Sequence, residues 1–311
     1  MILEVRDLFK SFGEKKVLEG IQLYVEGGRA LGLLGRNGAG KTTTIRIIMD
    51  VFPPDSGEVL CDGGPINRKQ VAIGYLPEEH GLYPKIEITE QLIYLGKLRG
   101  MKAKDARAAI AKWMKRLEVD EYAKRRLETL SKGNQQKVQL VATLISNPDI
   151  VILDEPFSGL DPVNAALLKD VVKEIIKEGK IVLFSSHQMN YVEEFCDNIA
   201  ILHNGKIALA GAINDIKRSY DRNVLVVRSL QKDAIMQYCL NDIKENIVTA
   251  SMHRDYLKVT LKAVEQKGAF MAALHAKGFD LDSIGVYEPS LNDIFVQYTG
   301  EEPQAEGGKA Q

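Results

Sequence analysis

The stretch Gly35-Arg-Asn-Gly-Ala-Gly-Lys41-Thr42-Thr43 decides how this chain is organised. It fits the pattern G-x-x-x-x-G-K-[ST], in which backbone N–H groups surround nucleotide phosphates, the lysine reaches the β- and γ-phosphates and the hydroxyl ligates Mg²⁺. Residues 30–34 predict a short buried strand before this loop, and residues 43–49 predict an apolar helix that begins beside the phosphates. The candidate nucleotide-binding residues here are Gly35, Asn37, Gly38, Ala39, Gly40, Lys41, Thr42 and Thr43.

Length and composition narrow the class of protein. The 311 residues favour two domains over one. Charge is nearly balanced, at 41 Lys and Arg against 42 Asp and Glu, so we expect no nucleic-acid partner. The three cysteines lie far apart without metal-ligand spacing, which suggests buried or semi-buried thiols in a reducing cytosol. The N-terminal stretch has no signal-peptide core, and no apolar run approaches the roughly 20 residues of a membrane span, so any role at a membrane is expected to be peripheral.

The segments before and after the loop both predict strands. Residues 1–34 alternate as strands do and predict an antiparallel edge sheet that leads into the loop. Phe12, within this segment, either stacks on an adenine or is one more strand aromatic, and both readings stay open. Residues 57–61 and 71–76 predict further strands, the second ending at Pro77-Glu78-Glu79-His80.

The apolar spacing becomes helical from about residue 88 to residue 147. This insertion is rich in Lys and Arg, and its charges fit a solvated face better than a binding stripe. Its last helix opens at Leu130-Ser-Lys-Gly-Asn-Gln-Gln136. Ser131 either caps this helix or, with Gly133, forms a second anion site at the helix N-terminus.

Two adjacent carboxylates follow the next strand, Asp149-Ile-Val-Ile-Leu-Asp154-Glu155. Its four apolar residues predict a buried parallel strand, and open α/β sheets bind ligands at the carboxyl ends of such strands. A Mg²⁺ ion would explain carboxylates there, with Asp154 and Thr42 supporting the metal and Glu155 orienting or deprotonating the attacking water. A surface turn with two acids is the alternative.

His187 ends the buried strand predicted at 181–186, at the same edge of the sheet as the loop. This placement favours a contact to the γ-phosphate over an ordinary surface histidine. Further along the chain, the pattern predicts a helix from Pro162 to about residue 178, a helix at 189–197 and a hairpin through residues 203–205, closing a domain near residue 219.

Residues 223–299 predict a separate α+β module in the order β-α-β-β-α-β, compatible with a ferredoxin-like fold. Strands are expected at 223–228 and 257–261, and helices at 232–240, 264–276 and 291–298. No catalytic group of residues is evident in this module. Residues 300–311 have the composition of a disordered tail.

Taken together, these motifs resemble the ATP-binding-cassette ATPases across residues 1–219. The resemblance implies an α/β phosphate-loop fold with an antiparallel β subdomain and a helical subdomain at about 86–147, followed by the α+β accessory domain at 220–299. It also implies two cassettes that face each other with ATP between one partner's phosphate loop and the other's signature. Carried over by position, the resemblance implies the following roles: Phe12 at the adenine, Lys41 in the phosphate loop, Glu78 in the loop that usually holds glutamine, Ser131 and Gly133 in the signature, Asp154 at the metal, Glu155 as catalytic base, Asp161 in the cross-dimer loop and His187 as switch histidine.

Two departures from the family pattern concern the phosphates. Lys132 and Asn134 stand where Gly and Gln are usual, but Ser131 remains and Lys132 adds positive charge nearby. Glu78 replaces a neutral amide, and its carboxylate is repelled by a γ-phosphate unless Mg²⁺ or the lysine intervenes. We therefore count Glu78 among the catalytic and metal-binding candidates and expect an active enzyme with altered coupling to its partner.

The stretches 77–83, 130–136 and 288–295 together resemble one branch, the ATP-binding subunits of bacterial sodium-efflux and drug-resistance exporters. This implies a homodimeric ATPase that uses ATP and Mg²⁺, sits on the cytoplasmic face of the membrane and energises export by a separate permease, in which substrate selectivity resides. One alternative is a soluble nucleotide switch in translation or DNA maintenance, although those proteins usually carry two cassettes or a long coiled coil. A ligand-sensing role for the accessory domain is a further alternative.

Overall fold

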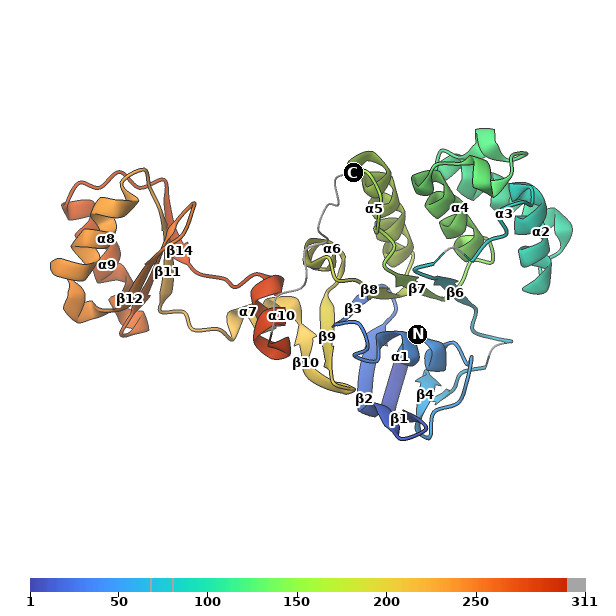
Figure 1. The fold of residues 1–311 in the computed structure, drawn as a ribbon, viewed down its shortest axis with the longest axis horizontal. Coiled ribbons are helices and arrows are strands. Elements are labelled where there is room, and N and C mark those ends of the chain that lie inside the picture. The colour runs from blue at the N-terminus through green and yellow to red at the C-terminus, as the bar shows by residue number, and fades with distance from the viewer. Residues whose placement is uncertain (68, 80, 301–311) are drawn as a thin grey trace. The chain divides into compact units, whose positions relative to one another are not determined.

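The computed structural model describes residues 1–67, 69–79 and 81–300, so the expected tail lies outside the described residues except for Gly300. The chain forms two compact units (Figure 1). One unit contains residues 1–213 and the chain from Leu291 onward, and the other contains Asn214–Ser290.

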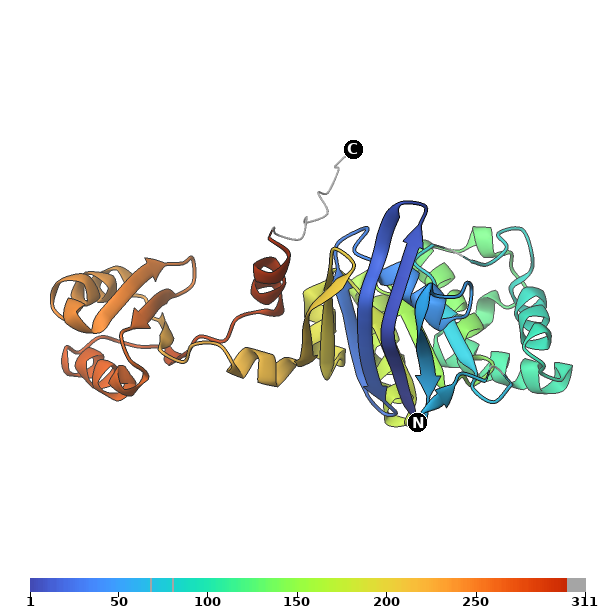
Figure 2. The ribbon, with the colours of Figure 1, turned by 90° about the horizontal axis from the view of Figure 1, so that it is seen from below.

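An antiparallel sheet opens the first unit, as the alternating sequence predicts. Its strands are β1 (Ile2–Phe12), β2 (Lys15–Glu26), β4 (Ser56–Cys61) and β5 (Gly64–Pro65), in the order β2-β1-β4-β5. Figure 2 shows the two long blue strands, β1 and β2, side by side. The apolar positions Leu3, Val5 and Leu8 are buried, whereas neighbouring polar positions are more exposed. This sheet therefore covers the core on one face only.

A six-stranded sheet forms the centre of the same unit, in the order β10-β9-β3-β8-β7-β6. The strands from β9 to β6 pair in parallel, and β10 pairs antiparallel to β9. Every residue of β3, β7 and β8 is buried, as continuous apolar runs predict for strands covered on both faces. The strand bounds are β3 (Ala30–Gly35), β6 (Ile73–Leu76), β7 (Ile150–Asp154), β8 (Ile181–Ser185), β9 (Asn198–His203) and β10 (Lys206–Ala212).

Helices cover the central sheet and form a separate helical part beside β6 (Figure 1). The helical part occupies the predicted insertion and consists of α2 (Ile88–Leu98), α3 (Ala103–Arg116), α4 (Lys132–Leu144) and the 3₁₀ turns η1 (Asp120–Tyr122) and η2 (Leu127–Thr129). The first unit also contains α1 (Lys41–Ile48), α5 (Pro162–Lys177) and α6 (Met189–Phe195), and α7 (Ile213–Arg218) follows β10 at the boundary between the units. Chain contacts group most of α7 with the second unit.

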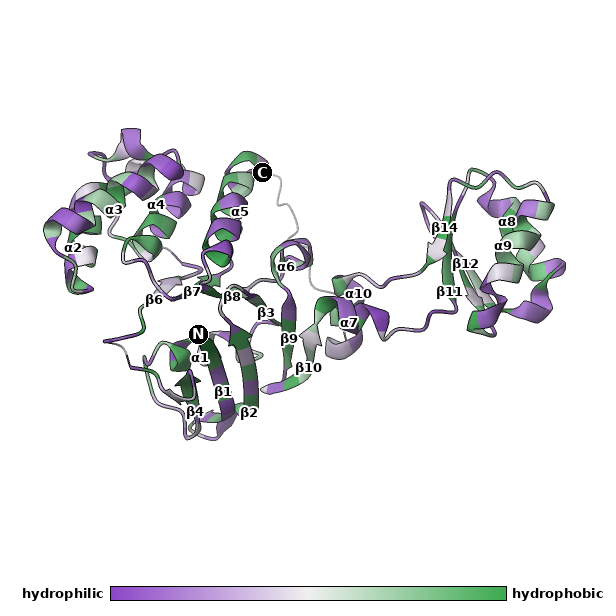
Figure 3. Cartoon of the chain, turned by 180° about the vertical axis from the view of Figure 1, so that it is seen from behind, coloured by the Kyte–Doolittle hydropathy of each residue, from purple (hydrophilic) through white to green (hydrophobic). Residues whose placement is uncertain are grey.

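The second unit has the β-α-β-β-α-β order that the sequence predicts. Its antiparallel sheet has the strand order β12-β13-β11-β14, built from β11 (Val224–Arg228), β12 (Ile247–Met252), β13 (Leu257–Leu261) and β14 (Ser283–Val286). The helices are α8 (Lys232–Asn241) and α9 (Lys267–Ala276), with the 3₁₀ turns η3 (Lys244–Asn246) and η4 (Val264–Gln266). Alternate residues of the strands join Ile235, Phe270 and Leu274 of the helices in a core of its own. Figure 3 shows the apolar β11 in green at the centre of this unit.

The last helix, α10 (Leu291–Thr299), packs against α6 and β9 and belongs with the first unit. The sequence-based ranges, 220–299 for the accessory domain and 1–219 for the cassette, assign this helix to the accessory domain instead. Leu291, Ile294 and Phe295 form a buried stripe at helical spacing. That stripe indicates an amphipathic helix, but it does not indicate which core the helix covers.

We expect Gly32→Ala to destabilise the first unit. A Cβ on Gly32 would lie 2.7 Å from Val192 Cγ1 and 3.2 Å from Cys196 Sγ, so α6 would have to move away from β3. Overpacking of this kind costs about 1–3 kcal/mol. A lower denaturation midpoint in urea would show it. Gly64→Ala is the matched control because no atom lies within 4 Å of its added Cβ, and equal midpoints for the two variants would contradict this packing.

Candidate active site

A cleft of about 960 Å³ lies at the carboxyl ends of the central strands. It brings together most of the residues that the sequence singles out: Phe12, Gly35, Asn37, Gly38, Gly40, Lys41, Thr42, Thr43, Glu78, Asp154, Glu155 and His187. Ala39 of the loop is buried, with 7% of its surface exposed. Phe12 is 52% exposed, and its ring meets Phe52 edge-on at 5.6 Å. Its exposure leaves it accessible to a base, but both interpretations of this residue stay open.

The phosphate loop joins the end of β3 to the start of α1. Gly38 and Gly40 have φ angles of +82° and +114°, which side chains other than glycine rarely adopt. A Cβ on Gly40 would also lie 2.6 Å from Leu18 Cδ2. These two positions therefore require glycine. The first turn of α1 contains no acidic residue, so its free N–H groups and the positive end of its dipole suit an anion.

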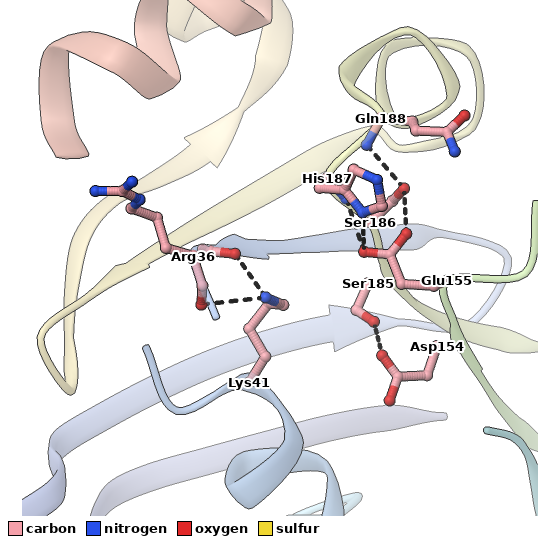
Figure 4. Close-up of polar contacts among 9 residues, drawn as sticks. Arg36, Lys41, Asp154, Glu155, Ser185, Ser186, His187 and Gln188 are labelled. Carbon is pink, nitrogen blue, oxygen red and sulfur yellow. Dashed lines mark hydrogen bonds and ion pairs between the residues drawn. The ribbon is translucent and has the colours of Figure 1, made fainter. Parts of the chain in front are cut away.

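Lys41 is the cation of this loop. Its Nζ donates hydrogen bonds to the carbonyl oxygens of Gly35, at 2.5 Å, and Arg36, at 3.4 Å (Figure 4). Burial lowers the pKa of Lys41, and the nearby carboxylates of Glu155, Asp154 and Glu78 oppose that shift. An anion bound in the cleft would stabilise the charged lysine further.

Asp154 ends β7 and is held by hydroxyl groups from the two neighbouring strands. Parallel pairing places Asp154 opposite Ser185 of β8, and Ser185 Oγ donates a hydrogen bond to Asp154 Oδ1. On the other side, the Tyr75 hydroxyl of β6 donates to Asp154 Oδ2 at 3.2 Å. Burial and the Asp154 charge both raise the pKa of Tyr75, so the phenol remains protonated as a donor. The carboxylate, only 5% exposed, is thus fixed in orientation at the cleft.

Glu155 turns away from the strand direction, with a φ of +48° that is uncommon outside glycine. One carboxylate oxygen, Oε1, accepts the backbone N–H of His187 at 2.8 Å and lies 2.8 Å from Nδ1 of the same residue. Oε2 accepts a hydrogen bond from Ser186 Oγ at 3.1 Å (Figure 4). Burial raises the pKa of Glu155, while these contacts with His187 and Ser186 oppose the rise. The carboxylate is 7% exposed and held in one orientation.

The residues present fit a Mg²⁺ ion bound together with a nucleotide. Within the described chain, no group of three or more His, Cys, Asp or Glu residues could hold a metal ion alone. Mg²⁺ commonly binds through one or two carboxylates plus substrate phosphates and water. Thr42, the oriented Asp154 and the exposed Glu78 line the cleft together and offer one hydroxyl and two carboxylates.

Besides the buried Ala39, three predicted site residues do not line the cleft of their own chain. Ser131 is the N-cap of α4, and its Oγ accepts the N–H of Asn134 at 3.3 Å, which confirms the capping interpretation. Asp161 caps α5 by accepting the N–H groups of Val163 and Asn164, each at 3.0 Å. Gly133 follows in the first turn of α4, where a Cβ would lie 2.8 Å from Asn164 Nδ2. An anion contact by Ser131 and Gly133 stays a prediction.

Several polar residues that hold the site together were not predicted from the sequence. Ser185, Ser186 and Tyr75 orient the two carboxylates, and two consecutive serines at the end of an apolar strand were the available signal. Gln139 of α4 was not predicted either, and its Nε2 donates to the carbonyl oxygens of Pro77 and Glu79, at 3.3 and 3.2 Å. These bonds tie the loop that contains Glu78 to the helix that Ser131 caps.

The fold and this cleft define a phosphate-loop nucleotide-binding protein, and comparison with known proteins gives its family. Residues 18–158 match the family described as ABC transporter, and residues 211–299 match the ATP-binding protein DrrA1-3-like C-terminal domain. The chain is 39% identical over 300 residues to the uncharacterized ABC transporter ATP-binding protein YhaQ of Bacillus subtilis (strain 168), covering 96% of this chain and 99% of the relative.

The linearmycin resistance ATP-binding protein LnrL of Bacillus subtilis (strain 168) is 30% identical over 316 residues, covering 96% of this chain and 98% of LnrL. A solved structure described as an ATP binding subunit of an ABC transporter superposes with a TM-score of 0.64 at 30% identity, covering 70% of this chain and 92% of the other. The chain therefore belongs to the ATP-binding proteins of ABC transporters. It carries a DrrA-like C-terminal domain, whose matched range includes α10.

Among the helices in the described part of the chain, none has both the length and the apolar character needed to cross a bilayer.

We expect Ser185→Ala to raise the Mg²⁺ concentration needed for half-maximal ATPase activity. The change removes the donor that orients Asp154 Oδ1, and loss of such a supporting bond typically costs about 10- to 100-fold in metal affinity or activity. Tyr75→Phe is the comparison variant, and its longer bond to Oδ2 predicts a smaller effect. A Mg²⁺ titration unchanged by Ser185→Ala would argue against Asp154 as the metal-supporting residue.

Proposed function

We propose that this protein hydrolyses ATP and that hydrolysis drives export by a separate membrane permease. The observation that supports hydrolysis best is the Glu155 carboxylate. It is buried beside the phosphate loop and oriented by contacts from His187 and Ser186. A fixed carboxylate at that place is suited to orient and deprotonate a water that attacks the γ-phosphate.

The chain's other groups act by positioning and charge. Lys41 and the loop N–H groups hold the β- and γ-phosphates, and the start of α1 faces the same anion. Thr42, Asp154 and Glu78 would hold Mg²⁺, which offsets negative charge on the phosphates when bound. His187, whose Nδ1 lies against Glu155, holds the carboxylate until a γ-phosphate offers the imidazole a second partner.

In this proposal each cleft is half of a site. Ser131 and Gly133 lie at the N-terminus of α4, where the first turn has no acidic residue and Lys132 adds positive charge. Such a helix end is suited to an anion, yet it lies outside the cleft of its own chain. A second copy of the chain, facing the first, would bring these residues to the γ-phosphate and Asp161 to the dimer contact. The functional unit is therefore a homodimer with ATP between its subunits.

The permease contact is assigned to the helical part and to the loop that contains Glu78. Gln139 bonds this loop to α4, so a displacement of the loop would also move Ser131. This connection supports coupling between permease and nucleotide, with the ATPase on the cytoplasmic face of the membrane. The name of LnrL indicates resistance to linearmycin, which favours drug-like compounds as cargo. Sodium ions are a second cargo class, supported by the sequence resemblance alone.

Glu155→Gln is expected to keep ATP binding but to slow hydrolysis by about 10²- to 10⁴-fold, because the amide cannot accept the proton. Single-turnover hydrolysis of radiolabelled ATP measures the chemical step, and size-exclusion chromatography detects an accumulated ATP-bound dimer. His203→Gln, a histidine outside the cleft, is a control expected to retain activity. If Glu155→Gln hydrolyses ATP nearly as fast as the unmodified protein, Glu155 is not the catalytic base.

Ser131→Arg is expected to abolish hydrolysis while leaving monomeric ATP binding intact, since Ser131 lies outside the cleft of its own chain. Ser131→Ala separates the two interpretations of this residue. Loss of the helix cap alone costs about 1 kcal/mol of stability and leaves the rate unchanged, whereas loss of a phosphate contact lowers the rate. Steady-state ATPase assays with melting curves measure both. An active, monomeric Ser131→Arg protein would contradict the shared site.

A further inference from the structure

The final helix is anchored on the cassette at its first residue. The N–H of Leu291 donates a 2.7 Å hydrogen bond to Oε1 of Glu193 in α6, across 98 residues of sequence. A carboxylate at the N-terminus of a helix satisfies an otherwise unpaired donor and interacts favourably with the helix dipole. The side chains of Leu291 and Ile294, on α10 itself, are buried. This end of α10 is therefore fixed on the surface of the first unit.

Phe295 is the side chain of α10 that reaches the nucleotide cleft. It is only 3% exposed, yet it lines the cleft that contains Arg36, Lys41 and Glu155. In Figure 4 the pale red α10 lies on the side of the cleft toward which the Arg36 side chain points. One wall of the cleft is thus built from the far end of the chain, on the side of the phosphate loop.

The helix beneath α10 leads directly to the catalytic candidates. α6 begins two residues after His187, and the His187 N–H and Nδ1 both contact Glu155 Oε1. α6 is held on β8 by ring contact between Phe195 and Phe184, whose centroids are 5.9 Å apart. Anchoring of α10 on Glu193 of the same helix places it in direct contact with the element that positions His187.

We propose that α10 is a wall of the nucleotide site and that Phe295 contacts the bound nucleotide. The accessory unit ends at Ser290, one residue before this helix. An apolar ring at this position excludes water from one side of the phosphates and thereby strengthens the contacts that Lys41 makes to them. The inference depends on ATP binding in the cleft, as the proposed function does.

The test compares full-length chains that differ at one position of α10. Phe295→Ala is expected to raise the Kd for a fluorescent ATP analogue, measured without Mg²⁺ to prevent hydrolysis. The rise should be roughly 2- to 10-fold, as for the loss of one aromatic contact. Phe295→Leu keeps an apolar side chain in the buried position. Its Kd should therefore lie between the Kd of the unmodified chain and that of Phe295→Ala. Asn292→Ala is the matched control, because Asn292 is exposed on the same helix.

Melting temperatures measured without nucleotide separate an effect of the substitution on nucleotide binding from an effect on packing. A purely structural Phe295 would lower the melting temperature and leave the Kd unchanged, which would overturn the inference. If Phe295→Ala fails to fold, a Phe295→Leu protein that binds the analogue as tightly as the unmodified chain overturns it equally. An unmodified chain that binds no ATP analogue would instead contradict the proposed function. Weaker binding by both Phe295 variants, with Asn292→Ala unchanged, supports the contact.

Discussion

The parallel pairing of β8 with its two neighbours is the constraint on which the site depends. Ser185 at the end of β8 stands opposite Leu33 of β3 on one side and Asp154 of β7 on the other. A slip of one residue would turn every side chain to the opposite face, and all three strands are buried on both faces. This register therefore brings the phosphate loop, both carboxylates and His187 to the same edge of the sheet.

Charged side chains are partly or fully buried at that edge of the sheet. Burial lowers the pKa of Lys41 and raises the pKa of Glu155, so it opposes the charged form of each. Hydrogen bonds from Ser186 and from the His187 N–H offset part of this cost at Glu155. Those from Ser185 and Tyr75 fix the Asp154 carboxylate in orientation. A bound triphosphate would add negative charge beside Lys41, and binding to the folded state alone would stabilise the fold. The backbone of Glu155 at this edge is also strained, with a φ of +48°.

The sequence predicted the parts of the fold that depend on local patterns. The loop glycines, the apolar runs of β3 and β7 and the helical spacing of α2–α4 all have signals within a few residues of one another. The return of α10 to the cassette could not be predicted in this way, because its apolar stripe could cover either core and its anchor lies on α6. The hydroxyl donors to Asp154 were missed for a similar reason, since strand register and not sequence spacing brings Ser185 and Tyr75 to it.

The central claim is that the phosphate loop is half of a site completed by a second chain. Mixing Lys41→Ala chains with Ser131→Arg chains and measuring ATPase activity tests it most directly. Each variant alone is expected to be inactive, but a mixed dimer contains one site with an intact loop from one chain and an intact signature from the other. Hydrolysis is expected to return on mixing. A mixture that forms mixed dimers by native mass spectrometry yet stays as inactive as its components would contradict it.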